Sequence, residues 1–361
     1  MLVNSSPFPA RRDRVIPSLH ELKAQAFLTT ALPNVRYLTG FTGSNGALLL
    51  TADRALLFTD PRYGAQAPQE SDCEVKVAKG PLLKEVAKWI KRLKLRSLIF
   101  EQNRISFEDY GQLKEHTENL RLKPAVGLVE TLRMVKSEEE IAKIRQSVIL
   151  NSAALEQSLR RFKPNMSEMD LAAEIEYRMR RLGAEAPAFE TIVASGQRSA
   201  LPHARPTRAR IQADELLLID MGAMVAGYAS DMTRTYAVGK LDAKRERMYR
   251  AVLESQLAVL AAIKPGMTCA SVDRVARDVL SGFGWEKLFV HSTGHGLGLE
   301  IHERPRVGRK EKTKLVTGMV ITVEPGIYEE GCGGVRIEDT IVVTTNGCEV
   351  LTPTNKDLLT L

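Results

Sequence analysis

Short apolar runs alternate with helical patterns along the first third of the chain. Four runs have the length and apolar content of strands, and they cover residues 35–41, 47–51, 55–59 and 95–101. The stretch 84–96 places apolar residues at helical spacing and lysine or arginine between them, which predicts an amphipathic helix with a solvated basic face. This alternation predicts an α/β unit that extends to about residue 132.

A strong helix start marks a second domain. Ser137 is placed to cap the helix, and Glu140 follows three residues later, as a capping box requires. We therefore predict one domain over residues 1–134 and a second over residues 135–361. In the second domain, helices are expected at about 137–161, 167–182, 242–263 and 269–281. A strand-rich block follows each pair of helices, so the order of helices and then strands occurs twice.

The first strand-rich block contains a predicted hairpin with an acid on each strand. Asp220 ends an apolar strand, and Asp231 lies in the return strand. If the turn centres on Val225 and Ala226, the two acids stand opposite each other with Cβ atoms ~5 Å apart. Two carboxylates at that separation repel each other, so the arrangement favours a cation between them.

The second strand-rich block repeats this pattern. Glu324 ends an apolar strand, Glu338 lies in the return strand, and their midpoint is Gly331 in a turn-rich segment. The four carboxylates of the two hairpins carry four negative charges, which two divalent cations would balance. Paired metal ions ~3.5–4 Å apart can activate a water and hold both ends of a hydrolysed bond.

Simpler interpretations of these acids remain open. Each could be an exposed residue near the end of a hairpin. Asp220 and Glu324 follow apolar strands, where an unpaired carboxylate is costly, so a salt bridge to Arg234 or Arg336 is the better alternative for them. Three further acids are interpreted as loop or solvent-facing residues: Glu329, Glu330 and Asp339.

The composition narrows the class of protein. The 361 residues are 44% hydrophobic and 26% charged, which is typical of a soluble globular chain. No apolar run reaches the ~18 residues that span a bilayer, and the N-terminus lacks the apolar core of an export signal, so we expect a cytoplasmic protein without a membrane partner. The net charge of +7 could indicate nucleic-acid binding, but the basic residues are dispersed, so no nucleic-acid partner is expected. The four cysteines form no CxxC pair and are interpreted as reduced thiols.

Half of the six histidines lie between residues 291 and 305. His291, His295 and His302 are interleaved with glycines, which let a backbone approach a ligand closely. The pattern lacks the strand, helix and acid of a dinucleotide fingerprint. His203 lies between two prolines that fix the shape of its loop. From these features alone, each histidine could be a ligand or a plain polar loop residue.

Together these residues resemble the M24 peptidases, which have the pita-bread fold. The five metal ligands of that family correspond here to Asp220, Asp231, His295, Glu324 and Glu338. The motif HxxGHGxGxxxHExP at residues 291–305 resembles the proline-specific members, aminopeptidase P and prolidase, and SDxTRT, VEPGIY and GVRIEDT match as well. The stretches 37–50 and 56–67 are similar to the creatinase-type N-terminal domain. The resemblance implies an α/β (α+β) chain, with a creatinase-like α/β domain followed by a pita-bread catalytic domain.

The resemblance also implies the metal chemistry. Asp231 and Glu338 would bridge two divalent ions, Asp220 would complete one ion, and His295 and Glu324 would complete the other. A water or hydroxide between the ions would attack the scissile carbonyl, with Glu324 as general base. Four carboxylates and one imidazole form an oxygen-rich set that favours Mn²⁺, with Co²⁺ or Zn²⁺ as alternatives.

Further residues acquire expected roles from the same resemblance. His203 and His302 would contact the substrate and stabilise the tetrahedral intermediate, and His291 would line the substrate pocket. Arg336 and Tyr328 would orient Asp220, as outer-shell partners of metal ligands commonly do.

The implied function is hydrolysis of the bond between an N-terminal residue and a proline at the second position. The enzyme could be a dipeptidase (prolidase) or an aminopeptidase P that acts on longer peptides. A catalytically silent pita-bread binding module is a third alternative, although such modules characteristically lose ligands. Three arginines could hold the free carboxylate of a dipeptide: Arg205, Arg304 and Arg306. Family members are often dimers, so a homodimer is expected.

Overall fold

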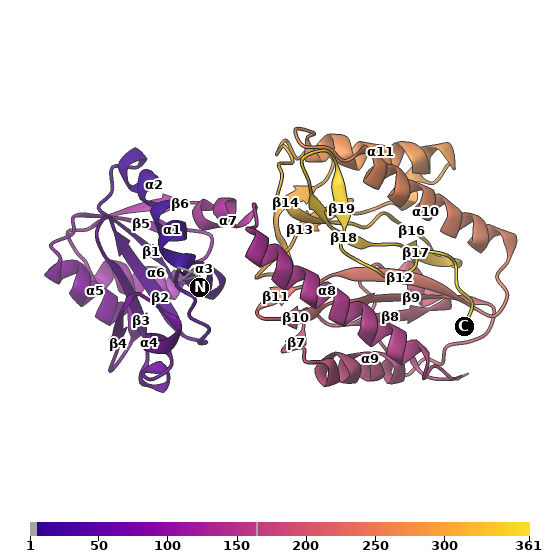
Figure 1. The fold of residues 1–361 in the computed structure, drawn as a ribbon, viewed down its shortest axis with the longest axis horizontal. Helices are drawn as coiled ribbons and strands as arrows, with labels where there is room; N and C mark the ends of the chain where they lie inside the picture. The colour runs from indigo at the N-terminus through magenta and orange to yellow at the C-terminus, as the bar shows by residue number, and fades with distance from the viewer. Residues whose placement is uncertain (1–5, 164) are drawn as a thin grey trace, which may run out of the picture. The chain divides into compact units, whose positions relative to one another are not determined.

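The computed structural model describes residues 6–163 and 165–361. The chain divides into two compact units, residues 1–133 and 134–361, and Figure 1 traces the elements of each. The N-terminal stretch considered as an export signal begins with residues 1–5, which lie outside the described residues. Among the helices of the described chain, none is long and apolar enough to cross a membrane.

The first unit is built on a six-stranded mixed sheet with the order β4-β3-β2-β1-β5-β6. Strand β2 is antiparallel to both β1 and β3, whereas β5 is parallel to β1 and β6. The strands are β1 (Ala26–Thr29), β2 (Gly46–Thr51), β3 (Ala55–Thr59), β4 (Glu74–Val77), β5 (Ser97–Glu101) and β6 (Arg121–Ala125). The helices are α1 (Phe8–Asp13), α2 (Ile16–Glu21), α3 (Leu32–Thr39), α4 (Ala67–Glu70), α5 (Leu82–Arg92), α6 (Phe107–His116) and α7 (Leu128–Arg133), with a 3₁₀ turn at Pro61–Tyr63.

Helices cover both faces of this sheet. Leu49 and Phe58 pack on one face against Val86 and Trp89 of α5, and Leu57 packs on the other face against Val35 of α3. Alternate residues of a strand point to opposite faces, so neighbouring residues of β3 serve two different cores. The amphipathic helix predicted at 84–96 is present as α5.

The strand predicted at residues 35–41 is wrong, because this stretch lies in α3 and its C-terminal cap. Pro33 occupies the first turn of the helix, and Gly40 ends it in the left-handed region with φ of 82°. Proline near the start and glycine just past the end are typical of a helix. These two signals outweigh the apolar run, which by itself does not distinguish a buried strand from a buried helix.

The second unit repeats one order of elements, as the sequence predicts. Helices α8 (Glu138–Leu159) and α9 (Glu168–Leu182) precede the first block, and α10 (Ala243–Ala262) and α11 (Cys269–Gly282) precede the second. The first block has β7 (Ala186–Pro187), β8 (Ile192–Ser195), β9 (Glu215–Met221), β10 (Ala223–Val225), β11 (Tyr228–Ala229) and β12 (Met232–Val238). The second has β13 (Gly294–Gly296), β14 (Glu303–Val307), β15 (Val320–Val323), β16 (Gly326–Glu329), β17 (Gly333–Arg336), β18 (Asp339–Val343) and β19 (Cys348–Val350). The capping box of Ser137 and Glu140 is confirmed at the start of α8, and 3₁₀ turns occur at Gly196–Ala200 and Glu286–Leu288.

Each pair of helices covers the strands of its own half (Figure 1). Leu217 and Ile219 of β9 pack with α8 and α9 in one core. Ile321 and Val323 of β15 pack with α10 and α11 in another. Because side chains alternate along a strand, Asp220 and Glu324 are directed away from these helices, toward the interior of the unit.

Candidate metal centre and active site

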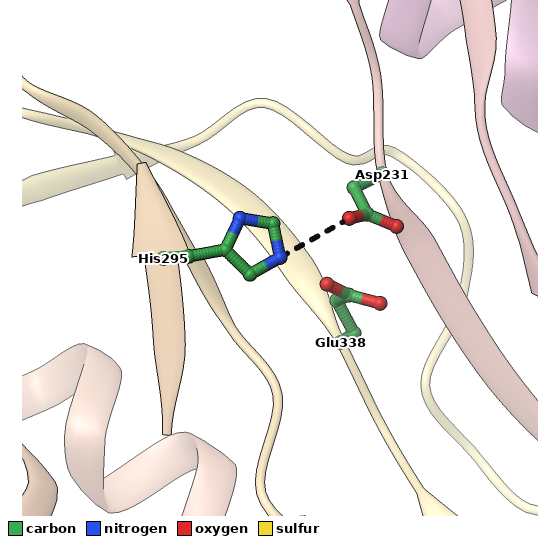
Figure 2. Close-up of side chains that lie close together, drawn as sticks. All are labelled: Asp231, His295 and Glu338. Carbon is green, nitrogen blue, oxygen red and sulfur yellow. Dashed lines mark ion pairs between the residues drawn. The ribbon is translucent and has the colours of Figure 1, made fainter. Parts of the chain in front are cut away.

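Three predicted metal ligands converge from distant parts of the second unit. Asp231, His295 and Glu338 each offer an atom that lies within 4.8 Å of the others. His295 belongs to β13, whereas Asp231 directly precedes β12 and Glu338 directly precedes β18. Figure 2 shows the two carboxylates and the imidazole directed toward one another, with Nε2 of His295 3.5 Å from Oδ2 of Asp231.

The other two predicted ligands belong to the same cluster. Nε2 of His295 also lies 3.5 Å from Oε1 of Glu324. The negative charge of Asp220 is close enough to raise the pKa of both Asp231 and Glu338. The structure therefore brings together all five residues that the sequence singled out.

The register of the second hairpin agrees with the sequence analysis. Val323 pairs with Asp339 in one ladder, and Gly326 pairs with Arg336 in the next. The pairs before and after the two acids have the same register, which places Glu324 opposite Glu338.

The first hairpin differs from the predicted register. Its turn lies at Ala226 and Gly227, which both have positive φ, 50° and 76°, and not at Val225 and Ala226. This shift of one residue makes Thr233, and not Asp231, the direct partner of Asp220. The predicted opposition of the two aspartates is therefore wrong, and they approach the cluster from offset positions.

Burial and crowding of the acids dominate the electrostatics of the cluster. Burial raises the pKa of Asp231 to about 7, and the charges of Asp220 and Glu324 act in the same direction. Burial and the neighbouring acids hold the pKa of Glu338 well above its usual value. Burial alone would lower the pKa of His295, but its contact with Asp231 and the charge of Glu324 raise it to about 9. The cluster therefore attracts positive charge.

The donor set fits divalent cations. Oδ1 of Asp220 and Oε1 of Glu338 are buried and have no hydrogen-bond partner among the described residues, and a buried polar atom without a partner is costly. The Nδ1–H of His295 donates to the carbonyl oxygen of Gly296 at 3.0 Å, so loss of the other ring proton would free the lone pair of Nε2 for a cation between the acids. Carboxylate oxygens with one imidazole suit Mn²⁺, Co²⁺ or Zn²⁺.

Two threonines hold the acids, and the sequence analysis did not single them out. The hydroxyl of Thr233 donates to Oε2 of Glu338 at 2.7 Å. The hydroxyl of Thr322 donates to Oε1 of Glu324 at 3.1 Å and accepts from the backbone N–H of His295 at 3.1 Å. Thr322 lies two residues before Glu324, so strand alternation places both on one face. That spacing is the signal that could have identified it.

Arg336 and Tyr328 lie beside Asp220, as the resemblance implies. Arg336 donates from one nitrogen to Oδ2 of Asp220 and from another to the hydroxyl of Tyr328, each at 2.6 Å. The salt bridge considered as the simpler alternative for Asp220 is thus present within the cluster. Arg336 also donates to the carbonyl of Pro202 at 3.2 Å, which ties the loop of His203 to the site.

The remaining histidines surround the cluster. Nδ1–H of His291 donates to the carbonyl of Ser292 at 2.8 Å, so its Nε2 accepts from the Tyr328 hydroxyl at 2.9 Å. The ring of His302 lies 4.4 Å from the ring of His295. Burial lowers the pKa of His291 and of His302, so both rings favour the neutral form. His203 is exposed on its loop.

The interpretation of Asp339 as a solvent-facing acid is wrong. Its side chain is fully buried and forms ion pairs with Arg234 at 2.8 Å and Lys356 at 2.7 Å. Arg234 is therefore occupied by Asp339 and is not the partner of Asp220. The same arginine donates to the backbone carbonyl of Glu338 at 2.6 Å, so it fixes the strand that carries this ligand.

A basic cavity of about 600 Å³ adjoins His291. Its walls include Arg306, Lys287 and Lys310. Of the other two arginines considered for carboxylate binding, Arg205 is paired with Glu190 at 3.1 Å, and Arg304 is exposed and absent from these walls.

Comparison with known families agrees with this geometry. The sequence pattern of "Metallopeptidase family M24" matches residues 142–345, and that of the "Creatinase/Prolidase N-terminal domain" matches residues 11–135. The chain belongs to metallopeptidase family M24. It is accordingly a metallopeptidase, and the family implies that it binds divalent metal ions. The expected creatinase-type domain followed by an M24 domain is confirmed.

Similar M24 proteins extend over nearly the whole chain. The Xaa-Pro dipeptidase of Pyrococcus horikoshii is 37% identical over 348 residues, which cover 96% of this chain and 97% of that protein. The solved structure of an Xaa-Pro dipeptidase from Bacillus anthracis is 40% identical with a TM-score of 0.95, and the match covers 98% of this chain and 99% of that one. The structure of an X-Pro aminopeptidase from Thermotoga maritima is 36% identical with a TM-score of 0.90, and covers 97% and 100% of the two chains.

Proposed function

We propose that this M24 enzyme hydrolyses the peptide bond between an N-terminal residue and proline, with Xaa-Pro dipeptides as its first substrate class. The observation that carries the proposal is the convergence of four acids and His295 on one buried cluster. The similarity to Xaa-Pro dipeptidases supports the choice of proline peptides.

Two divalent ions, with Mn²⁺ as the first choice, would be held by the five clustered side chains. Asp231 and Glu338 would bridge them, Asp220 would complete one, and His295 and Glu324 would complete the other. When bound, such ions supply Lewis acidity toward the scissile carbonyl and activate water near neutral pH. The unsatisfied oxygens of Asp220 and Glu338 support this assignment.

Glu324 would act as the general base toward the attacking water. Its Oε1 accepts from Thr322, and its Oε2 lies 4.0 Å from Nδ1 of His291. A carboxylate fixed in this way keeps one orientation while a proton moves. Arg336 and Tyr328 would hold Asp220 in place for its ion.

The surrounding histidines would bind the substrate. His302 and His203 can each donate a hydrogen bond to the developing oxyanion, which is where donors lower a barrier most. His291 would form a wall of the substrate pocket, next to the basic cavity.

The similar Xaa-Pro dipeptidases make the dipeptidase the first candidate. Arg306 and Lys310 line the cavity that borders His291, and such cationic side chains would suit the free carboxylate of a dipeptide. The likeness to an X-Pro aminopeptidase keeps aminopeptidase activity on longer peptides as the second candidate. A silent binding module is disfavoured, because all five ligand side chains are present.

The test is to compare hydrolysis of an Xaa-Pro dipeptide and an Xaa-Pro-Yaa tripeptide with added Mn²⁺, Co²⁺ or Zn²⁺. We expect a higher kcat/KM for the dipeptide, and abolished activity in Asp231→Ala with unchanged activity in Glu330→Ala, an exposed acid of the second hairpin. A preference for the tripeptide would favour the aminopeptidase. Near wild-type turnover by Asp231→Ala would refute the metal assignment.

A further inference from the structure

The segment 289–293 carries His291 to the site without belonging to a helix or a strand. Its backbone groups therefore need partners outside any regular ladder. One end of the segment contacts the cluster, because the carbonyl of Thr293 accepts from the backbone N–H of Glu324 at 2.8 Å. A displacement of this segment would move a substrate-facing histidine and the backbone of the proposed base.

A buried ion pair on α11 supplies those partners. Asp273 and Arg277 stand one helical turn apart, and Nε of Arg277 lies 2.7 Å from Oδ2 of Asp273. The side chains are 1% and 9% exposed, so neither charge is compensated by solvent. Replacing a buried ion pair by apolar residues often leaves the free energy of unfolding unchanged or raises it. Stability alone therefore does not explain this pair, which indicates that it serves to position other groups.

The two side chains form hydrogen bonds with different residues of the segment 289–293. Arg277 donates to the carbonyl of Phe289 at 2.9 Å and to the carbonyl of His291 at 2.6 Å. Asp273 accepts from the backbone N–H of Thr293 at 3.1 Å and from its hydroxyl at 2.9 Å.

Ring contacts continue from the arginine to the histidine. The guanidinium of Arg277 lies 4.2 Å from the centre of the Phe289 ring. That ring packs edge-on against His291, with centroids 5.0 Å apart. His291 is thus held through its backbone and its ring on one side, and through the Tyr328 hydroxyl on the other.

We propose that Arg277, oriented by Asp273, is a positioning residue for His291. This inference rests on the proposed function of the site, in which His291 borders the substrate. Arg277 acts through the segment it binds, and the side chain of Asp273 keeps the guanidinium in the plane that reaches both carbonyls.

The experiment is a double-mutant cycle on Xaa-Pro hydrolysis with Arg277→Met, His291→Ala and the double variant. We expect Arg277→Met to lower kcat/KM about 10–100-fold, as loss of an outer-shell partner does, with the same division between KM and kcat as His291→Ala. In the His291→Ala background the further loss should fall below about twofold, because coupled residues are not additive. Arg277→Lys, which keeps the charge but not the fork of donors, should lie between the wild type and Arg277→Met.

The matched control is Arg274→Met, an exposed arginine of the same helix. A loss in Arg277→Met that adds fully to that of His291→Ala, or that Arg274→Met reproduces, overturns the proposal. If Arg277→Met does not fold, the near-isosteric Asp273→Asn takes its place in the cycle with the same expectations.

A crystal structure of Asp273→Asn separates this inference from the proposed function. If the wild type cleaves no Xaa-Pro peptide, the proposed function fails, but the coordinates still test the positioning. Separation of His291 Nε2 from the Tyr328 hydroxyl supports it, and an unmoved ring overturns it.

Discussion

At the scale of single residues, the metal cluster depends on side chains outside the ligand motifs. Thr233 is one example, since its hydroxyl donates to Glu338 and accepts from Nε of Arg336 at 3.0 Å. It thereby couples a proposed bridging ligand to the arginine that holds Asp220. Hydrogen bonds of this kind fix the orientation of a ligand and tune its affinity for the metal.

We expect Thr233→Val to weaken metal binding about 10–100-fold, which is the usual cost of losing an outer-shell hydrogen bond. The measurement is the metal concentration that restores half of the activity to chelator-treated enzyme. Thr191→Val is the control, because Thr191 is also buried but its hydroxyl has no hydrogen-bond partner among the described residues. Equal midpoints for the two variants would contradict the role given to Thr233.

A single buried acid should make the stability of the first unit depend on pH. Burial raises the pKa of Glu101 to about 7, although Thr29 and Asn34 donate to it. An acid whose pKa is higher in the folded state binds more protons there, so its contribution is present below the unfolded pKa and is lost as pH rises through the folded one. From pH 5 to pH 8 the free energy of unfolding should fall by up to roughly 3 kcal/mol.

Glu101→Gln should flatten this dependence, whereas Glu118→Gln, at an exposed position, should keep it. The chain has two tryptophans, Trp89 in the first unit and Trp285 in the second. Urea unfolding followed by the fluorescence of Trp89 in a Trp285→Phe background therefore reports the first unit alone. A slope that persists unchanged in Glu101→Gln would show that another group is responsible.

At the scale of elements, the sequence predicted the helices that have clear capping residues and regular apolar spacing. The four long helices of the second unit end within two residues of the predicted positions, because capping residues and apolar spacing agree there. The stretch 35–41 was misassigned because an apolar run fits a strand or a buried helix. The offset of Asp231 from Asp220 was missed because one residue in the turn at Ala226 shifts the whole register. The five proposed ligands could be identified from sequence motifs. The roles of Thr233, Thr322 and the ion pair of Asp273 and Arg277 could be recognised only from the three-dimensional structure.

The start of α8 shows how an element can be tied to the site by a buried ion pair. Lys136 directly precedes the capping residue of α8, and its Nζ lies 3.1 Å from Oε2 of Glu303. Their side chains are only 1% and 5% exposed. The other carboxylate oxygen of Glu303 accepts from the backbone N–H of Glu300 at 3.2 Å, which closes the turn that carries His302.

We expect Lys136→Met to destabilise the second unit by about 3–5 kcal/mol, because removing one partner of a buried ion pair is strongly destabilising. Lys143→Met is the matched control, since Lys143 pairs with Glu139 on the exposed face of the same helix and should cost less than about 1 kcal/mol. The measurement is urea unfolding reported by Trp285 in a Trp89→Phe background. Similar midpoints for the two methionine variants would show that the buried pair contributes no more than a surface pair.

At the scale of the whole molecule, the clustered residues all lie in one of the two units. All five clustered ligands and the three histidines around them belong to residues 134–361. The first unit has its own core on both faces of its sheet, and so it can keep its structure when the cluster changes its charge. The homodimer expected from the family stays a prediction.

Removal of the metal ions should therefore lower the stability of the second unit only. Ions that bind the folded cluster and not the unfolded chain raise the free energy of unfolding. The increase depends on the ratio of ion concentration to Kd and is about 2.7 kcal/mol when the concentration is a hundred times Kd. Without ions, the four clustered acids repel one another, which lowers the stability of the second unit. We expect chelation to lower the thermal midpoint seen by Trp285 in a Trp89→Phe background by several degrees, and added Mn²⁺ to restore it. The thermal midpoint reported by Trp89 in a Trp285→Phe background should stay constant. Equal shifts in both variants would mean that metal binding is not confined to the cluster in the second unit.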